Sequence, residues 1–209
     1  MLGQNGAGKT TTIKMLTTLL APTSGMCKVF GCDTFGQEKQ IRKHINFIFG
    51  GEMGVYRRLS GRDNLRYFAN LYLMDTAERE RRINEILELV ELTDAADRLA
   101  ETYSKGMTQR LQIARGLIND PEIIFMDEPT VGLDPLGAHM LRGIIRKLRD
   151  DGKTVLLTTH YLPEAEELCD RIVILNHGEI VARGTPEEIK GDSATLEEAY
   201  ISLIKGDVQ

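Results

Sequence analysis

The sequence has few cysteines, no basic block and no long apolar run. Its three cysteines, Cys27, Cys32 and Cys169, form neither an even disulfide set nor the spacing of a zinc site, which favours reduced thiols in a cytosolic compartment. The formal net charge of −5 argues against a broad nucleic-acid footprint. No apolar run approaches the roughly 18 residues that cross a bilayer. Any membrane role must therefore come through a partner chain.

The remaining composition is ordinary for a soluble globular protein. The chain has 209 residues, of which 42% are hydrophobic, enough for one large core with a subdomain. Short apolar runs separated by helical patterns predict an α/β fold with a mostly parallel sheet. From Gly61 to Leu99 apolar residues repeat at three and four positions, which predicts an inserted all-helical segment. The predicted strands are residues 27–30, 45–49, 123–126, 155–157 and 172–175.

A complete phosphate-binding loop, G-x-x-x-x-G-K-[ST], runs from Gly3 to Thr10. Its glycines let backbone N–H groups face nucleotide phosphates, and the helix that begins near Lys9 adds its positive dipole end. Lys9 would neutralise the β- and γ-phosphates, and Thr10 would hold Mg²⁺. The candidate nucleotide-binding residues here are Asn5, Gly6, Ala7, Gly8, Lys9, Thr10 and Thr11.

Two acidic residues, Asp127 and Glu128, end the buried apolar run that begins at Ile123. In that position Asp127 would reach Mg²⁺, and Glu128 would orient or deprotonate the attacking water. The alternative is that two adjacent acids merely begin a solvated loop. Their pairing with the upstream phosphate loop favours the nucleotide interpretation.

Residues 103–107 read Tyr-Ser-Lys-Gly-Met and precede a helical pattern. This segment resembles the L-S-G-G-Q signature of ABC-type ATPases, with matches at Ser104 and Gly106 and departures at the other three positions. A hydroxyl and backbone N–H groups at a helix start suit the binding of a γ-phosphate. Without its neighbours the segment would more often be a simple N-capped helix start.

Two further segments resemble motifs of the same family. Residues 131–135 resemble its D-loop and include Asp134. His160 follows the apolar run 155–157 and resembles the switch histidine, which hydrogen-bonds the γ-phosphate. With these two, five motifs occur in the family's order.

The chain departs from the family pattern in two further places. Gly51 stands where the family has a Mg²⁺-binding glutamine, and we hypothesise that the adjacent Glu52 substitutes for it. Only Met1 and Leu2 precede the phosphate loop, so the resemblance implies that the first strands and the adenine-stacking residue are missing. We therefore expect a poorly anchored loop and reduced nucleotide affinity.

The resemblance implies a P-loop ATPase with a core of residues 1–59 and 109–209 and a helical subdomain of residues 60–108. ATP and Mg²⁺ are the implied cofactors. Two copies, most simply a homodimer, would stack head to tail, so that the signature of one covers ATP on the loop of the other. The pair would drive a separate transmembrane permease from the cytoplasmic face of the cell membrane. Residues 103–107 and 194–200 look most like the ABC-2-type exporters of drugs, polysaccharides or lipids.

Two other functions stay open at this point. One is a soluble ABC ATPase outside transport, and the other is a truncated, non-catalytic nucleotide-binding or regulatory module. The first would bring tandem domains, coiled coils or zinc-binding cysteines, of which this sequence has none. Met53, Val55 and Tyr56 are candidate permease contacts, with ordinary packing against the helical insertion as the alternative.

Overall fold

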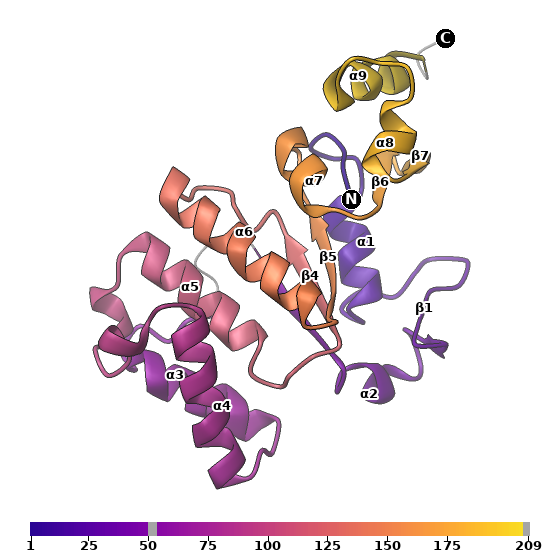
Figure 1. The fold of residues 1–209 in the computed structure, drawn as a ribbon. Helices are drawn as coiled ribbons and strands as arrows, with labels where there is room; N and C mark the ends of the chain where they lie inside the picture. Colours follow the sequence, from indigo (N-terminus) through magenta and orange to yellow (C-terminus); the bar gives the residue numbers. More distant parts are fainter. Residues whose placement is uncertain (50–53, 207–209) are drawn as a thin grey trace.

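A computed structural model describes residues 1–49 and 54–206 (Figure 1). Gly51, Glu52 and Met53, on which three of the expectations above rest, lie outside the described residues. The helices are α1 (Lys9–Leu16), α2 (Glu38–Ile41), α3 (Gly61–Leu71), α4 (Thr76–Leu89), α5 (Lys105–Gly116), α6 (Pro135–Asp150), α7 (Leu162–Leu168), α8 (Pro186–Lys190) and α9 (Leu196–Gly206), with 3₁₀ turns at Thr93–Ala95 and Ala100–Thr102. The strands are β1 (Lys28–Val29), β2 (Cys32–Asp33), β3 (Ile45–Phe49), β4 (Ile123–Asp127), β5 (Thr154–Thr158), β6 (Ile172–Asn176) and β7 (Glu179–Gly184).

The central sheet is parallel, as the sequence predicts. Its strand order is β3-β4-β5. Phe49 lies opposite Asp127, and Asp127 lies opposite Thr158. The carboxyl ends of the three strands therefore lie level with one another. Loops that leave these ends share one edge of the sheet, which is where ligands bind in open α/β sheets.

Helices cover both faces of this sheet because the strands are apolar on both sides. Ile124 and Met126 of β4 point to one face and pack in the cluster that contains residues of α5 and α6. Phe125, between them, packs on the other face against Ile13 of α1. The two-residue period of the strand thus divides one apolar run between two hydrophobic layers.

Leu2 joins the parallel sheet to the antiparallel pair β6-β7. It forms parallel bridges to Thr159 on one side and to Ile174 on the other. Its N–H donates to the Val173 carbonyl at 2.8 Å, and its carbonyl accepts from the Leu175 N–H at 2.8 Å. The side chain is also buried. The expected poor anchoring of the phosphate loop is therefore wrong, since two residues suffice to pair with strands on both sides.

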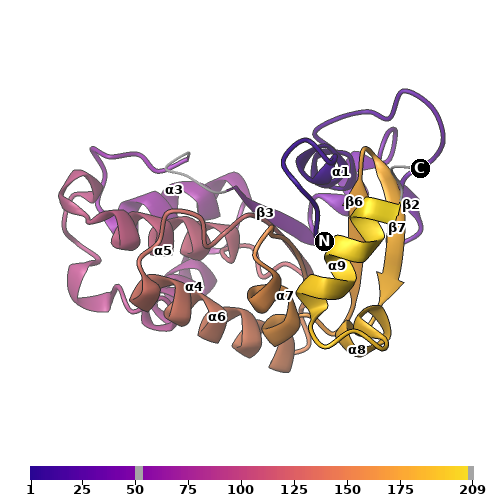
Figure 2. The ribbon, with the colours of Figure 1, turned by 90° about the horizontal axis from the view of Figure 1, so that it is seen from above.

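The helices α3, α4 and α5 lie together at one end of the molecule, and β6, β7, α8 and α9 lie at the other (Figures 1 and 2). Local caps fix where these helices begin: Ser60 accepts from the Asp63 N–H, and Asp75 accepts from the Ala77 N–H. The proposed subdomain boundary at residue 108 falls inside α5, which continues from Lys105 to Gly116. Across residues 1–49 and 54–206, no helix is both long and apolar enough to cross a membrane.

Candidate nucleotide site

The phosphate loop leaves the sheet directly after Leu2. A Cβ on Gly3 would lie 2.6 Å from the Leu175 carbonyl oxygen, so only glycine fits here without a shift of the backbone. Gly6 and Gly8 have φ angles of 83° and 103°, which non-glycine residues rarely adopt. Helix α1 then begins at Lys9, and the first N–H groups of a helix have no acceptor within it. Backbone donors at this point are suited to bind an anion.

The other predicted loop residues divide between the exposed tip and its base. Asn5, Gly6 and Thr11 are exposed, as an incoming ligand requires. Ala7 is buried, and its carbonyl accepts from the N–H of Gly178 at 3.1 Å. Gly178 lies in the turn between β6 and β7, so this hairpin supports the loop from outside the parallel sheet.

Lys9 is the most enclosed polar side chain of the loop, with 5% of it exposed. Its Nζ donates to the carbonyl oxygens of Gly3 at 2.7 Å and Gln4 at 3.2 Å. The same Nζ lies 3.4 Å from Oε1 of Glu128. The ammonium is therefore held inside the curve of the loop, facing the carboxylate that follows β4.

Thr10 and Asp127 meet at the carboxyl end of β4. The Thr10 hydroxyl donates to Asp127 Oδ2 at 2.7 Å, across 117 positions of sequence. Asp127 also accepts from the Thr158 hydroxyl at 2.5 Å. Three oxygen-bearing side chains thus converge at the edge where the phosphate loop starts its helix. Such a set has the chemistry that Mg²⁺ prefers.

Glu128 has a left-handed backbone, with φ 49°, which turns the chain sharply after the strand. Its N–H donates to the carbonyl oxygen of Thr158 at 3.1 Å and lies 3.1 Å from that residue's hydroxyl oxygen. His160 approaches the carboxylate from the end of β5, with Nδ1 3.3 Å from Oε1. The structure therefore brings together Lys9, Thr10, Asp127, Glu128 and His160, which the sequence places in three separate motifs.

Ser104 and Gly106 lie at the start of α5. Ser104 is the N-cap, accepting from the Met107 N–H at 3.2 Å, and its side chain is exposed. The preceding Tyr103 is buried, and its hydroxyl donates to the Ala95 carbonyl at 2.7 Å, which gives this departure from the signature a packing role. Burial also raises the pKa of the Tyr103 hydroxyl.

Asp134 is the N-cap of α6, accepting from the Gly137 N–H at 2.6 Å, and its side chain is exposed. Among the described residues, no hydrogen bond or ion pair joins Ser104 or Asp134 to the phosphate loop. These candidate residues therefore form a surface separate from the cluster around Lys9.

Thr158 is a contributor that the sequence interpretation did not name as a site residue. It bonds both Asp127 and the backbone of Glu128. The signal was its position at the end of a predicted strand, but the strand register that sets it opposite Asp127 is not visible in sequence.

Two of the candidate permease contacts are described. Val55 is half-buried and packs against the main core. Tyr56 is 47% exposed, and its ring meets that of Tyr67 edge-on at 4.8 Å. Arg115 lies over the neighbouring Phe68 ring at 5.2 Å, and burial lowers the pKa of this guanidinium. The exposed Tyr56 therefore lies beside the contact between Phe68 of α3 and Arg115 of α5.

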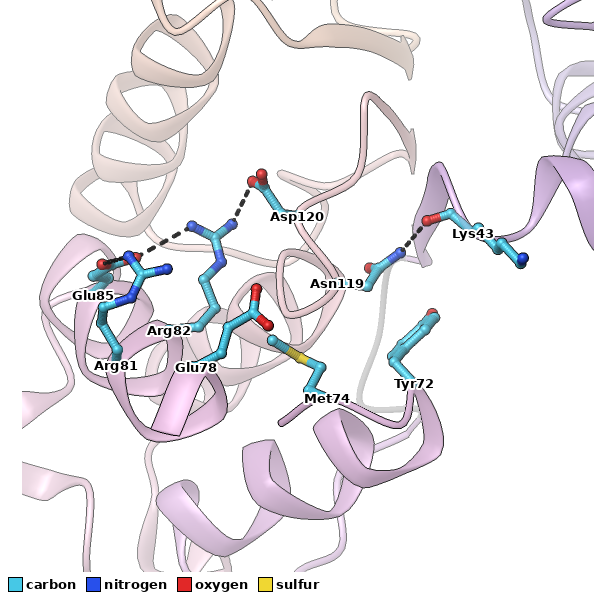
Figure 3. Close-up of a pocket in the computed structure, with 9 residues that line it drawn as sticks. All are labelled: Lys43, Tyr72, Met74, Glu78, Arg81, Arg82, Glu85, Asn119 and Asp120. Carbon is cyan, nitrogen blue, oxygen red and sulfur yellow. Dashed lines mark hydrogen bonds and ion pairs between the residues drawn. The ribbon is translucent and has the colours of Figure 1, made fainter. Parts of the chain in front are cut away.

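A separate cavity of about 450 Å³ lies between α4 and the segment that precedes β4 (Figure 3). Arg82 crosses this junction, donating to the Leu117 carbonyl at 3.0 Å and to Asp120 at 2.9 Å. Asn119 also borders it and donates to the Lys43 carbonyl at 3.4 Å. The cavity lies beside the amino ends of β3 and β4, the opposite end from Asp127. It is therefore distinct from the nucleotide site.

Comparison with known families matches residues 1–131 to the family described as ABC transporter. The chain belongs to the ABC transporter family. It is 38% identical over 205 residues to the ABC transporter ATP-binding protein NatA of Bacillus subtilis, covering 98% of this chain and 83% of NatA. It is 44% identical over 190 residues to the daunorubicin/doxorubicin resistance ATP-binding protein DrrA of Streptomyces peucetius, covering 91% of this chain but only 57% of DrrA.

Solved structures agree with this assignment. The ATP-binding subunit of an ABC transporter superimposes with a TM-score of 0.83 at 34% identity, covering 97% of this chain and 85% of that one. A dimeric ATP-binding cassette in a post-hydrolysis state, bound to ADP and Pi, superimposes with a TM-score of 0.77 at 30% identity, covering 88% and 83%. The chain thus has the P-loop fold of an ABC ATPase, as the sequence resemblance predicted. It is an ATPase.

Proposed function

We propose that this ABC ATPase binds and hydrolyses ATP to power export through a separate transmembrane permease. The observation that carries the proposal is the cluster at the carboxyl edge of the sheet. There Glu128 Oε1 lies 3.4 Å from Lys9 Nζ and 3.3 Å from His160 Nδ1. A cation, a carboxylate and an imidazole in direct contact provide the charge pattern that phosphoryl transfer to water requires.

The phosphate loop is the proposed phosphate site. Backbone N–H groups between Asn5 and Thr11 would face the phosphates, and Lys9 would neutralise their charge from inside the loop. Thr10 and Asp127 are the proposed ligands of Mg²⁺, because their oxygens already lie 2.7 Å apart. The chemistry that Mg²⁺ would supply there is positive charge, which stabilises the negative charge on the phosphates.

Glu128 is the proposed general base. Its backbone is fixed by Thr158, so its carboxylate is aimed toward Lys9 and the edge of the sheet. Acceptance of a water proton by Glu128 would generate the nucleophile, and His160 would hydrogen-bond the γ-phosphate beside it. Both roles need side chains within reach of one bound phosphate, and the contacts of Glu128 with Lys9 and His160 support this.

A second copy of the chain is the proposed partner across the nucleotide. Ser104 and Asp134 are exposed and Gly106 is half-buried, and all three lie at helix starts. In a head-to-tail pair they would face the loop of the partner and supply N–H and hydroxyl donors to the γ-phosphate. The related cassette with ADP and Pi is dimeric, which supports the pairing of two copies.

The permease partner and the export direction are proposed from the relatives. DrrA is a drug-resistance ATP-binding protein and NatA an ABC transporter subunit, and both are similar to this chain. The exposed Tyr56 lies where the helical subdomain, residues 60–108, adjoins the proposed core, residues 1–59 and 109–209, and is a candidate permease contact. Docking there would hold the chain on the cytoplasmic face of the cell membrane.

The test is to purify the chain, measure phosphate release from ATP with and without Mg²⁺, and follow its mass by light scattering. We expect Mg²⁺-dependent hydrolysis and an ATP-dependent dimer, which the E128Q variant would stabilise. Co-expression with a membrane protein encoded beside it should yield a complex. Hydrolysis without any such complex would favour a soluble ABC ATPase, and binding without hydrolysis would favour a regulatory module.

A further inference from the structure

The two residues after Glu128, Pro129 and Thr130, are bonded by side chains from two different helices. Gln109 of α5 donates its Nε2 to the Pro129 carbonyl at 3.2 Å. The Thr130 hydroxyl donates to Oε2 of Glu164 on α7 at 3.3 Å. We call this set of four residues, Gln109, Pro129, Thr130 and Glu164, the loop clamp. It holds one short segment from both sides.

The two helix side chains of the clamp, Gln109 and Glu164, are buried. Gln109 is 6% exposed and Glu164 is 1% exposed. The second oxygen of Glu164, Oε1, is buried and accepts no hydrogen bond from any residue in 1–49 or 54–206. Burying a carboxyl group with a single hydrogen bond is unfavourable compared with an apolar residue at the same place. Among the described residues, the Thr130 hydroxyl is therefore the hydrogen-bond partner that accounts for a carboxyl group at this buried position.

The clamped segment directly follows a residue that has an unfavourable backbone conformation. Glu128 precedes it with a left-handed φ of 49°, a conformation that is unfavourable for a residue with a side chain. Thr158 fixes the N–H of Glu128 on the strand side. On the other side the backbone continues through short turns, with the Val131 N–H donating to the Glu128 carbonyl at 3.2 Å. On that side, the two hydrogen bonds of the clamp hold the backbone in place.

We propose that Gln109 and Glu164 are positioning residues, which hold the segment Pro129–Thr130 and thereby set the direction of the Glu128 carboxylate. The proposal rests on the function proposed for Glu128. Gln109 also lies on the helix that begins at Ser104, and Glu164 lies on the helix that follows His160. The clamp therefore connects the base to the helix that begins at Ser104 and to the helix that follows His160.

The test compares five variants of the chain. T130V removes the hydroxyl with little change of shape, and T130S restores it. Q109L removes the donor to Pro129. E167Q is the matched control, because Glu167 is also on α7 but is half-exposed and pairs with Arg142 and Arg146 of α6. E164Q retains an oxygen that accepts from the Thr130 hydroxyl.

Two measurements are made on each variant. Amide hydrogen exchange of Val131 and Leu133 is measured without nucleotide, since their N–H groups bond Glu128 and Thr130 within the segment. Steady-state hydrolysis gives kcat and KM for MgATP. We expect T130V and Q109L to raise exchange about tenfold and to lower kcat about tenfold, with KM within about twofold. T130S, E164Q and E167Q should stay within about threefold of the parent.

The exchange result decides whether the clamp holds the segment, and it does so whether or not the parent chain hydrolyses ATP. Parental exchange rates in T130V and Q109L would overturn it. Faster exchange with an unchanged kcat would show that these bonds hold the segment, but it would overturn their role in positioning Glu128. A parent chain without hydrolysis would refute the proposed function, while exchange in T130V and Q109L would still report whether the segment is held.

Discussion

Lys9 Nζ lies 3.4 Å from Oε1 of Glu128, so the cation of the phosphate loop and the carboxylate after β4 form one ion pair. Lys9 is almost fully enclosed, whereas Glu128 is 27% exposed. A bound triphosphate would compete with the carboxylate for the ammonium. Phosphate binding and release of the Glu128 carboxylate toward water are therefore expected to occur together.

Substituting Glu128 by glutamine should remove hydrolysis but keep nucleotide binding. The amide cannot accept the water proton, and the loss of a general base lowers turnover by about 10²- to 10⁴-fold. The Kd for ATP, measured with a fluorescent analogue, should stay within about threefold. E122Q is the matched control, because Glu122 lies at the opposite end of β4 and pairs with His44 on the surface. Parental turnover in E128Q would refute the assignment.

Substituting Lys9 by methionine should weaken ATP binding. The variant keeps the length of the side chain but loses the charge, and a charge-assisted contact to phosphate is worth about 1.5–3 kcal/mol, or roughly 10- to 150-fold in Kd. Lys14 on the same helix is exposed, so K14M should bind ATP as the parent does. Calorimetric titration of both variants makes the comparison. Equal affinities would contradict the role given to Lys9.

The oxygen of Thr10 should control the response to Mg²⁺. T10V removes the hydroxyl that donates to Asp127, whereas T10S keeps it. We expect T10V to raise the Mg²⁺ concentration for half-maximal hydrolysis by about tenfold, consistent with the loss of one oxygen ligand. T10S should match the parent within about twofold. Identical Mg²⁺ titrations for T10V and T10S would show that this hydroxyl does not serve the metal.

Gly3 should be a strong determinant of stability. A methyl group there would approach the Leu175 carbonyl to 2.6 Å, so G3A should lower the free energy of unfolding by about 1–3 kcal/mol. Gly143 in α6 has open space around its position, and G143A should raise that free energy by about 0.5–1 kcal/mol. Urea denaturation of the two variants tests the contrast. Equal midpoints would contradict the crowding at Gly3.

Glu80 should give the helical segment a pH-dependent contribution to stability. Its hydrogen bonds from Arg66, at 2.9 Å, lower the pKa of the carboxyl below its ordinary value of 4.5. The contribution is therefore present above pH 4.5 and is lost as the pH falls through the lowered value. E80Q should be less stable than the parent by about 0.5 kcal/mol at pH 7, because the pair is partly exposed.

The measurement is thermal unfolding of E80Q and the parent from pH 7 down to pH 3. Their difference should shrink below about pH 4.5. Glu88 on the same helix is exposed, so E88Q should follow the parent at every pH. A difference that grows on acidification would reverse the sign and contradict the assignment.

The sequence predicted the elements that depend on local pattern. The strands 45–49 and 172–175 appear within a residue of the predicted bounds. The helical repeat that begins at Gly61 forms α3 and α4. These features depend on residues within a few positions of one another.

Other features depend on contacts between distant positions, which one sequence does not reveal. Thr10 meets Asp127 across 117 positions, and Gln109 meets Pro129 across 20. The motifs named the first pair as Mg²⁺ ligands without predicting the bond between them. Nothing in the pattern around Glu164 distinguished it from a solvated helix acid, because its burial depends on how α7 packs.

Leu2 directly precedes the phosphate loop and also joins the two sheets. Ligand binding to the loop and separation of the β6-β7 hairpin from β5 are therefore linked equilibria. If nucleotide binds only while Leu2 is paired, each tenfold excess of ligand over Kd adds about 1.4 kcal/mol to the free energy that separates the hairpin. Occupancy of the loop would thus be transmitted to α8 and α9, which pack beside that hairpin, without any contact between them and the nucleotide.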